Sequence, residues 1–441
     1  MEGTADPAAV VGAEGARRLV AHFFRHESGR LIASLVRRHG AAQLEVIEDA
    51  VQGALAAALS TWARRGIPDN PSAWLTRVAQ NGVIDQLRRR TRDRDLKAQL
   101  GEAGDSHPPA SSPPAEVAFV DEIDDDELRM LFVCCDPALD PRSQLVLALK
   151  WLGGFGAREI ATRLFITTAN AEKIVGRGRA RLEERWSRRE AGVPEPAPDE
   201  LAERLSAVQA VIYLLFNEGY SSQREDEVIV RELCEEALRL GQRLVAQRVG
   251  DVPESWALLA LMHFHIARLD ARLDGEGGLL LLEEQDRSRW DREHIHRGMM
   301  ALGRASAGER FSRYHAEAAV MAEHCLAPSF AETRWGEIVS LYELLERQAP
   351  SPLYTLNRAI ALAEWRGPEA GLEVLEAMTP PAWLLRYYLW DAALGELLRR
   401  AGRQERAASY LRRAIDAAPT RAERRIFEAR LQRCEAGDAS R

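Results

Sequence analysis

Apolar residues recur at the spacing of α-helices, and the pattern is clearest over residues 142–181. Leu145, Leu149 and Leu152 lie three or four positions apart, which predicts an amphipathic helix. Gly153 and a second glycine follow, and a glycine pair is typical of a helix end. The segment therefore predicts a helix that ends in a sharp turn.

Two more helices are expected after this turn. Residues 157–164 predict a short helix whose inner side carries Ile160 and the small Ala161, which suits a close helix crossing. Thr167 or Thr168 suits the N-cap of the next helix, because a hydroxyl there can accept a hydrogen bond from a backbone N–H. Two helices joined by such a turn predict a helix-turn-helix motif.

Periodic apolar positions predict helices elsewhere too, over residues 16–38, 44–62, 73–90 and 127–135. Aromatic residues make up only 7% of the chain, and the alternating β-branched runs typical of strands are scarce. We therefore predict an all-α fold, with two small helical domains and a helical-repeat extension at the C-terminus.

Charge is sorted into blocks along the chain. Residues 64–97 and residues 158–189 each hold nine Lys or Arg and four Asp or Glu, so each block carries a net charge of +5. A Pro-rich connector over 98–120 and an acidic run over 121–127 lie between them. Residues 191–441 account for the whole net charge of −8. Two basic modules separated by a tether predict two contacts with one nucleic acid.

Other classes of protein are disfavoured by what the sequence lacks. No apolar run has the length of a membrane span, and the N-terminus lacks the basic and apolar regions of a signal peptide. The five cysteines are scattered without a CxxC pair, which fits reduced thiols better than a disulfide framework. We expect a cytoplasmic protein with no membrane partner.

Two histidine pairs suggest a metal site at first sight: His263 with His265, and His294 with His296. On a helix, residues two positions apart point about 200° away from each other, so neither pair converges without a third ligand. No HExxH motif or cysteine cluster supplies one, and no P-loop, GxSxG or GxGxxG motif is present. We expect no metal, no cofactor and no enzymatic activity.

The order of two motifs makes the chain resemble a known family. IEDAVQGALAAALSTW at 47–62 precedes NPSAWLTRVAQNGVIDQLRRR at 70–90, and the basic helix-turn-helix then ends in GRGRARL. This order resembles an extracytoplasmic-function (ECF) sigma factor of the sigma-70 family, over about residues 12–190. The resemblance implies a region 2 domain over 12–97, a flexible linker over 98–120 and a region 4 helix-turn-helix domain over 121–190.

The chain departs from the family pattern in a few places. Gly53 follows the DAVQ sequence, where the family usually has an acidic residue. Gly176 and Gly178 lie inside the expected recognition helix, at about 1 kcal/mol each in helix propensity. Phe165 occupies the turn where glycine is common. These departures bear on polymerase affinity and on readout of the −35 element.

The resemblance also implies roles for particular residues. Docking of region 2 on a coiled coil of the core RNA polymerase clamp would use Glu48, Asp49 and Gln52. Capture of the melted −10 element would use Trp74, Asn81, Arg88, Arg89 and Arg90. Recognition of the −35 element would use Thr168, Asn170, Glu172, Lys173, Arg177, Arg179 and Arg181. Region 4 would also contact the polymerase flap.

Three of these assignments have an ordinary structural alternative. Asp49 could merely cap a helix, and Trp74 could be a core residue. Glu172 could point away from DNA, unless it accepts a hydrogen bond from a cytosine amine. Asn81 has the stronger case, because an amide in a helix interior is otherwise a poor helix former.

About 250 residues follow the sigma-like part. YLLFNEGYSSQ at 213–223 and EQDRSRWDR at 284–292 show neither helical nor strand periodicity throughout, and no chemical role follows from them. Both resemble signature phrases of the ECF subgroup that carries a tetratricopeptide-type C-terminal extension. The signature residues of the first phrase are Asn217, Glu218, Gly219 and Tyr220.

Small and apolar residues near the C-terminus recur at the spacing of a tetratricopeptide repeat. They are Leu394, Gly395, Leu398, Gly402, Ala407, Leu411, Ala414 and Pro419. Ala370 and Ala377 mark a degenerate unit before it. We therefore predict a helical extension over 191–345 and tetratricopeptide-like repeats over 346–441, with a regulatory protein as a candidate partner of the repeats.

The sequence thus predicts a sigma factor that binds core RNA polymerase and promoter DNA, with an extension that regulates it in cis. The alternative is a helix-turn-helix transcriptional regulator with a helical-repeat sensor. The basic module at 64–97 favours the sigma factor, because Trp74, Asn81 and the arginine end have no task in a simple operator-binding protein.

Overall fold

Helices are the main regular secondary structure of the part of the chain that the structure describes. This computed structural model describes residues 27–65, 67–99, 125–164, 166–188, 196, 198–221, 229–274, 278–308 and 310–438. Within these ranges there is no strand, only an isolated bridge between Leu273 and Leu279. The predicted all-α fold class is confirmed. Among the described helices, none is long and apolar enough to cross a membrane.

The chain divides into two compact units, one of residues 1–214 with 247–249, the other of 215–246 with 250–441. In the first unit, the first helix of the described residues covers residues 27–39. The unit continues with η1 (Ala41–Gln43), α2 (Leu44–Arg65), α3 (Pro71–Gln99), α4 (Asp126–Cys134), α5 (Pro141–Trp151), α6 (Ala157–Arg163) and α7 (Thr168–Ser187). Helix α8 (Pro198–Tyr220) contributes residues to both units.

Most predicted helices of the first unit are confirmed to within a few residues, but the predicted linker begins too early. Residues 98 and 99 belong to α3, because residues 91–99 contain no glycine or proline that would end the helix. The rest of the predicted linker, Phe165 in the turn, and the boundary at residue 190 lie outside the described residues.

The helix over 27–39 packs closely against the end of α5. A Cβ atom at Gly29 would lie 2.5 Å from the carbonyl oxygen of Leu152, so only glycine allows this approach. Gly178 has the same role on α7, since a Cβ atom there would lie 2.9 Å from Leu147 Cδ1 of α5. The glycine that costs α7 helix propensity therefore allows α7 to contact α5.

Side-chain caps fix where three helices of the first unit begin. Asp125 accepts a hydrogen bond from the backbone N–H of Leu128 at the start of α4, and Asp140 accepts one from Ser143 at the start of α5. Thr167 is the N-cap of α7 and accepts from the backbone N–H of Asn170 at 3.2 Å. Of the two predicted cap candidates, Thr167 is the one used.

A buried ion pair fastens the first part of α8 to the helices before it. Arg204 is 1% exposed and Asp136 is fully buried, and their Nη2 and Oδ2 atoms are 2.9 Å apart. Arg204 also donates to the carbonyl oxygen of Phe132, and Asp136 also receives Arg185 of α7 at 3.0 Å. Asp136 thereby links α7 to α8.

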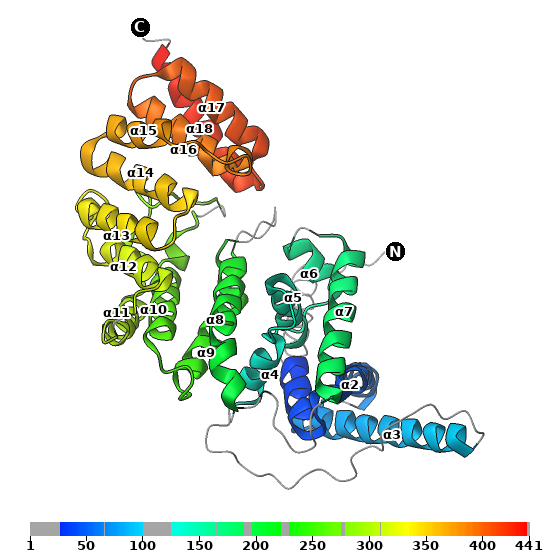
Figure 1. Cartoon of the computed structure of the whole chain (residues 1–441). Coiled ribbons are helices and arrows are strands. Elements are labelled where there is room, and N and C mark those ends of the chain that lie inside the picture. The colour runs from blue at the N-terminus through cyan, green and yellow to red at the C-terminus, as the bar shows by residue number, and fades with distance from the viewer. Residues whose placement is uncertain are drawn as a thin grey trace, which may run out of the picture. The chain divides into compact units, whose positions relative to one another are not determined.

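The second unit is a succession of helices in which each lies beside the next from α10 to α18 (Figure 1). It contains α9 (Arg231–Val245), α10 (Pro253–Ala267), η2 (Leu269–Ala271), η3 (Arg287–Arg289), α11 (Arg292–Ala305), α12 (Arg313–Leu326) and α13 (Trp335–Gln348). It continues with α14 (Pro352–Arg366), α15 (Pro368–Ala377), η4 (Leu384–Arg386), α16 (Tyr388–Arg400), α17 (Gln404–Ala417) and α18 (Arg421–Asp438).

The repeat-like spacing near the C-terminus corresponds to a close pair of helices, α16 and α17. A Cβ atom at Gly395 would lie 2.8 Å from Leu411, and Ala407 and Leu411 are fully buried. Gly402, with φ of 76°, forms the turn between the two helices.

The register predicted for the preceding unit is wrong. Ala377 is exposed at the end of α15, and Gly371 makes the close contact instead. A Cβ atom at Gly371 would lie 2.6 Å from the carbonyl oxygen of Ala359. The predicted spacing relied on Ala370 and Ala377, but Gly371, the smallest residue of α15, lies at the crossing with α14.

The phrase at 213–223 shows no helical periodicity throughout its sequence, but its first part is helical. Residues up to Tyr220 belong to α8, and its polar residues continue a helix whose apolar face is buried. All five cysteines of the chain are free and buried: Cys134, Cys135, Cys234, Cys325 and Cys434.

Replacing Asp136 by alanine should lower the free energy of unfolding of the first unit by about 3 to 5 kcal/mol, because it leaves the Arg204 guanidinium buried without its main counter-charge. Urea denaturation of the full chain, followed by circular dichroism, measures this. Glu184→Ala is the matched control: its pair with Arg188 is exposed on both sides and should contribute no more than about 1 kcal/mol. Equal effects of the two substitutions would contradict the role of the buried pair.

Candidate nucleic-acid and polymerase interface

Helix α7 has one buried and one exposed face. Ala171, Gly178, Leu182 and Trp186 are buried against the rest of the first unit. The exposed face contains the predicted −35 residues Thr168, Asn170, Glu172, Lys173, Arg177 and Arg181. The helix N-terminus and two of these cations are thus accessible, and Arg181 also donates to the carbonyl oxygen of Ala138 at 3.1 Å. Glu172 is exposed as well, so both interpretations of it stay open.

Arg179 differs from the other predicted −35 residues. Its side chain is 29% exposed, and its Nη1 atom is 3.2 Å from Glu48 Oε2 of α2. Its Nη2 atom is 3.9 Å from Glu45 Oε1. The structure therefore brings a residue assigned to DNA into contact with Glu48, which was assigned to the polymerase.

Glu45 also holds an arginine from the other basic module. Arg90 donates to Glu45 Oε2 at 2.8 Å, and this hydrogen bond is the main reason why the pKa of Glu45 lies below its usual value. The backbone N–H of Glu45 donates to Glu183 of α7 at 3.1 Å, whose own pKa is raised by burial. One turn of α2 thus holds cations from α3 and from α7.

The other residues assigned to the polymerase are exposed on α2. Asp49 and Gln52 are both exposed, and Glu48 is half-buried by its contact with Arg179. Helix α2 begins at Leu44, so Asp49 lies in its interior and does not cap it. The capping alternative for Asp49 is therefore excluded, and its docking role stays a prediction.

The residues assigned to the −10 element are spread along α3. Trp74 is half-buried, and its ring packs edge-on against Trp62 of α2 with centroids 5.6 Å apart. Asn81, Arg88 and Arg89 are exposed. Trp74 therefore contributes to the packing of α2 on α3 while part of its ring stays accessible, and Asn81 needs no buried partner.

The signature residues of the extension lie at the end of α8, where Gly219 is buried against the start of α9. A Cβ atom at Gly219 would lie 2.8 Å from three atoms: the Cys234 nitrogen, Leu233 Cβ and the Val230 carbonyl oxygen. The Gly219 carbonyl oxygen accepts a hydrogen bond from the Val230 N–H at 2.8 Å. Asn217 and Glu218 are half-buried beside it.

Tyr220 is held between two side chains of the second unit. The Tyr220 ring centroid is 4.5 Å from that of His265. The guanidinium carbon of Arg272 lies 3.8 Å from the Tyr220 ring centroid, which is a cation–π contact. Arg272 also donates to the Tyr220 carbonyl oxygen. The signature phrase thus packs α8 against α9 and orients Arg272, a residue that no motif or spacing singled out.

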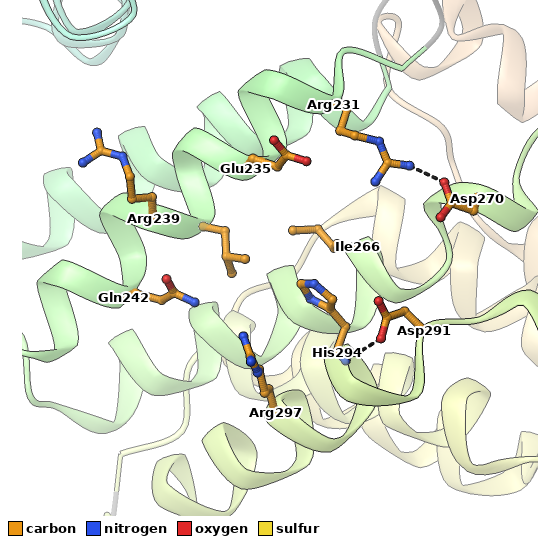
Figure 2. Close-up of a pocket in the computed structure, with 10 residues that line it drawn as sticks. Arg231, Glu235, Arg239, Gln242, Ile266, Asp270, Asp291, His294 and Arg297 are labelled. Atoms are coloured by element: carbon orange, nitrogen blue, oxygen red, sulfur yellow. Dashed lines mark hydrogen bonds and ion pairs between the residues drawn. The ribbon is translucent and has the colours of Figure 1, made fainter. Parts of the chain in front are cut away.

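One histidine of each predicted pair meets the other across α10 and α11. His263 Nδ1 and His294 Nδ1 are 3.0 Å apart, and burial lowers the pKa of His263 to about 4. Across the described ranges, no group of three or more His, Cys, Asp or Glu could hold a metal ion. His263 and His294 therefore form a hydrogen-bonded pair of neutral rings, and His294 also lines a pocket (Figure 2).

Comparison with known proteins places these features in a class. Residues 24–93 match sigma-70 region 2, and residues 204–306 match a family of unknown function (DUF6596). The chain is 36% identical over 406 residues to an uncharacterized protein of Rhizobium meliloti (strain 1021), covering 90% of this chain and 92% of that protein. No solved structure matches the chain. The chain belongs to the same family as the Rhizobium protein, and it combines a sigma-70 region 2 match with a DUF6596 match.

The region 2 match indicates a role for the chain as a sigma factor in transcription initiation, and hence as a non-enzymatic transcription factor. Such a domain implies binding to core RNA polymerase and to promoter DNA. It covers the helix over 27–39, α2 and most of α3, which include every residue assigned to the polymerase and to the −10 element.

Gly219→Ala should destabilise the second unit by several kcal/mol, on the order of 2 to 4, because the backbone of α9 cannot move away from the added methyl group at low cost. Gly303→Ala in α11 is the control, because nothing lies within 4 Å of its Cβ position, and this change should stabilise the helix by up to about 1 kcal/mol. Thermal unfolding of the Gly219→Ala and Gly303→Ala variants measures the two changes in stability. A neutral Gly219→Ala would show that the signature glycine is not a packing residue.

Proposed function

We propose that the protein is an ECF-type sigma factor that recruits core RNA polymerase to promoters in the cytoplasm, reading the −10 element with α2–α3 and the −35 element with α6–α7. The observation that carries the proposal is the sigma-70 region 2 match, followed by a second basic module. The exposed start of α7 in that module presents Lys173 and Arg177. In this assignment Glu48, Asp49 and Gln52 contact the polymerase clamp.

The −35 role of α7 is supported by its geometry. Its N-terminal residues and cations lie on the exposed face, while apolar residues hold the opposite face on α5. A helix docked this way can place Asn170 and Lys173 against base edges, and Arg177 against phosphate.

DNA and polymerase would have to compete with contacts inside the first unit. Arg90 and Arg179 are neutralised by Glu45 and Glu48 in the structure described here. Promoter phosphates attract the two arginines, and the polymerase clamp would occupy Glu48. The proposal therefore includes the release of the α2–α7 ion pairs when the two partners bind.

The purified chain should start transcription from specific promoters only when core RNA polymerase is present. If Lys173 and Arg177 read bases, replacing either with Ala should weaken promoter recognition by about 1 to 3 kcal/mol and relax the base preference at one −35 position. If they hold phosphate, each substitution should weaken binding to all sequences alike and make its salt dependence shallower. Transcript mapping in a reconstituted system measures both.

Arg188→Ala, on an exposed residue at the other end of α7, is the matched control. Specific operator binding by the chain alone, with no gain in initiation when core polymerase is added, would favour the helix-turn-helix regulator instead.

The proposal also assigns the extension a regulatory role in cis. The net negative charge of the chain lies beyond residue 190, so its field opposes the approach of DNA to the cationic helices. A regulatory protein on the helical pairs α14–α15 and α16–α17, which have tetratricopeptide-like spacing, would be the partner that relieves this effect.

A chain that ends after α8, at residue 221, keeps Arg204 and hence the buried pair with Asp136. It should bind promoter DNA roughly tenfold more tightly than the full chain at low salt, at the low end of electrostatic steering effects. The difference should vanish near 1 M salt, where the Debye length is about 3 Å. Fluorescence anisotropy over a salt series measures this difference. Identical affinities of the shortened and the full chain at all salt concentrations would show that the extension has no effect on DNA binding.

A further inference from the structure

Three arginines of the second unit contact aromatic residues of the two signature phrases, Arg272 at Tyr220 and the other two at Trp290. Arg268 follows α10, Arg272 follows η2, and Arg287 begins η3. Arg268 and Arg287 both lie over the ring of Trp290, with guanidinium carbons 5.2 Å and 4.8 Å from its centroid. We call Arg268, Arg272 and Arg287 the arginine cluster.

Among the residues that the structure describes, only neutral groups hold these guanidinium groups in place. Arg268 donates to Gln285 Oε1 at 3.1 and 3.2 Å. Arg287 donates to the carbonyl oxygens of His324 and Ala327 at the end of α12, and Arg272 donates to that of Tyr220. Such acceptors orient an arginine, but they do not neutralise its charge.

No carboxylate in the described part of the chain forms an ion pair with the arginine cluster. The pocket of about 230 Å³ on the neighbouring side of α10 is the contrast (Figure 2). Each arginine that lines this pocket forms an ion pair: Arg231 with Asp270, Arg239 with Glu236, and Arg297 with Glu293 at 2.8 Å. The chain therefore pairs its cations where they line that pocket and leaves them unpaired in the cluster.

Polar groups without a partner lie in the same place. Trp290 is 3% exposed and His324 is 7% exposed, and neither the Trp290 Nε1–H nor His324 Nδ1 has a hydrogen-bond partner. Buried polar groups are nearly always hydrogen-bonded, so orphan groups beside unpaired cations point to a missing acceptor. An anion would supply both the acceptor atoms and the charge.

Mutual repulsion inside the cluster agrees with this geometry. After burial, Arg268 is a further cause of the lowered pKa of Arg287, and Arg268 and Arg287 add to the effect of burial that lowers the pKa of His324 to about 3. Burying like charges without a counter-charge is costly, and a bound anion would remove that cost.

We infer that the arginine cluster, with Trp290 and His324, is a binding site for a small phosphate-type oxyanion. Guanidinium forks match the oxygen geometry of phosphate, and several cations without a counter-charge favour a ligand with at least two negative charges. The site lies within the DUF6596 match for Arg268, Arg272, Arg287 and Trp290, and it goes beyond the sigma-factor role. It gives the extension a small-molecule ligand.

The test is isothermal titration calorimetry of the full chain at constant ionic strength. Inorganic phosphate, ribose 5-phosphate and adenosine monophosphate are the probes, and chloride is the control. One saturable site with a dissociation constant below about 1 mM is expected for at least one phosphate and not for chloride. Tightest binding of an organic phosphate would identify a metabolite as the source, and tightest binding of inorganic phosphate would identify the free ion.

Variants and hydrogen exchange locate the site. Arg272→Gln and Arg287→Gln should each weaken binding at least tenfold, whereas Arg310→Gln, on a side chain 85% exposed, and Arg177→Ala on α7 should not. Phosphate should also slow amide exchange of the intact chain in segments 268–272 and 285–290, which keeps the test decisive if a cluster variant does not fold. Absence of saturable binding, binding unchanged in the cluster variants, or protection confined to α3 and α7 would overturn the inference.

Discussion

The buried pair of Arg204 and Asp136 is the interaction on which the organisation of the chain depends. It places a full positive and a full negative charge out of water, and it lasts only while both partners stay in position. Because Asp136 also receives Arg185, the helix assigned to DNA and the first turns of α8 share one counter-ion. Helix α8 contributes residues to both units and ends at the signature residues of the second.

The first unit also contains a second set of ion pairs, which are weaker than the buried pair and more accessible to solvent. Glu45 and Glu48 hold Arg90 and Arg179 in partly exposed pairs. Exposed pairs of this kind contribute about 1 kcal/mol or less, so they are easily exchanged for phosphates. The strong buried pair keeps the unit together while the weak surface pairs decide which cations are free, and this division lets one fold be stable and still open to DNA.

The sequence was sufficient to predict what local periodicity and capping determine. It predicted the all-α fold, the succession of helices from α2 to α7 and a cap at Thr167 or Thr168, of which the structure uses Thr167. It was insufficient where distant residues decide: Asp136 and Arg204 are 68 positions apart, and nothing near either of them signals a partner. Gly178 was counted as a cost to its helix because its contact with α5 could not be seen. Arg268 and Arg272 were missed for the same reason, since an unpaired charge is recognisable only after its surroundings are known.

The burial of every cysteine has a practical consequence. The thiolate is the reactive form of a cysteine, and burial raises the pKa of Cys234 and of Cys325 to about 12 and that of Cys135 still further. Cys134 and Cys135 belong to the first unit, and Cys234, Cys325 and Cys434 to the second. A thiol reagent therefore reacts with these cysteines only as fast as each unit opens. The rate at which the native cysteines react thus measures the opening of each unit, without any introduced label.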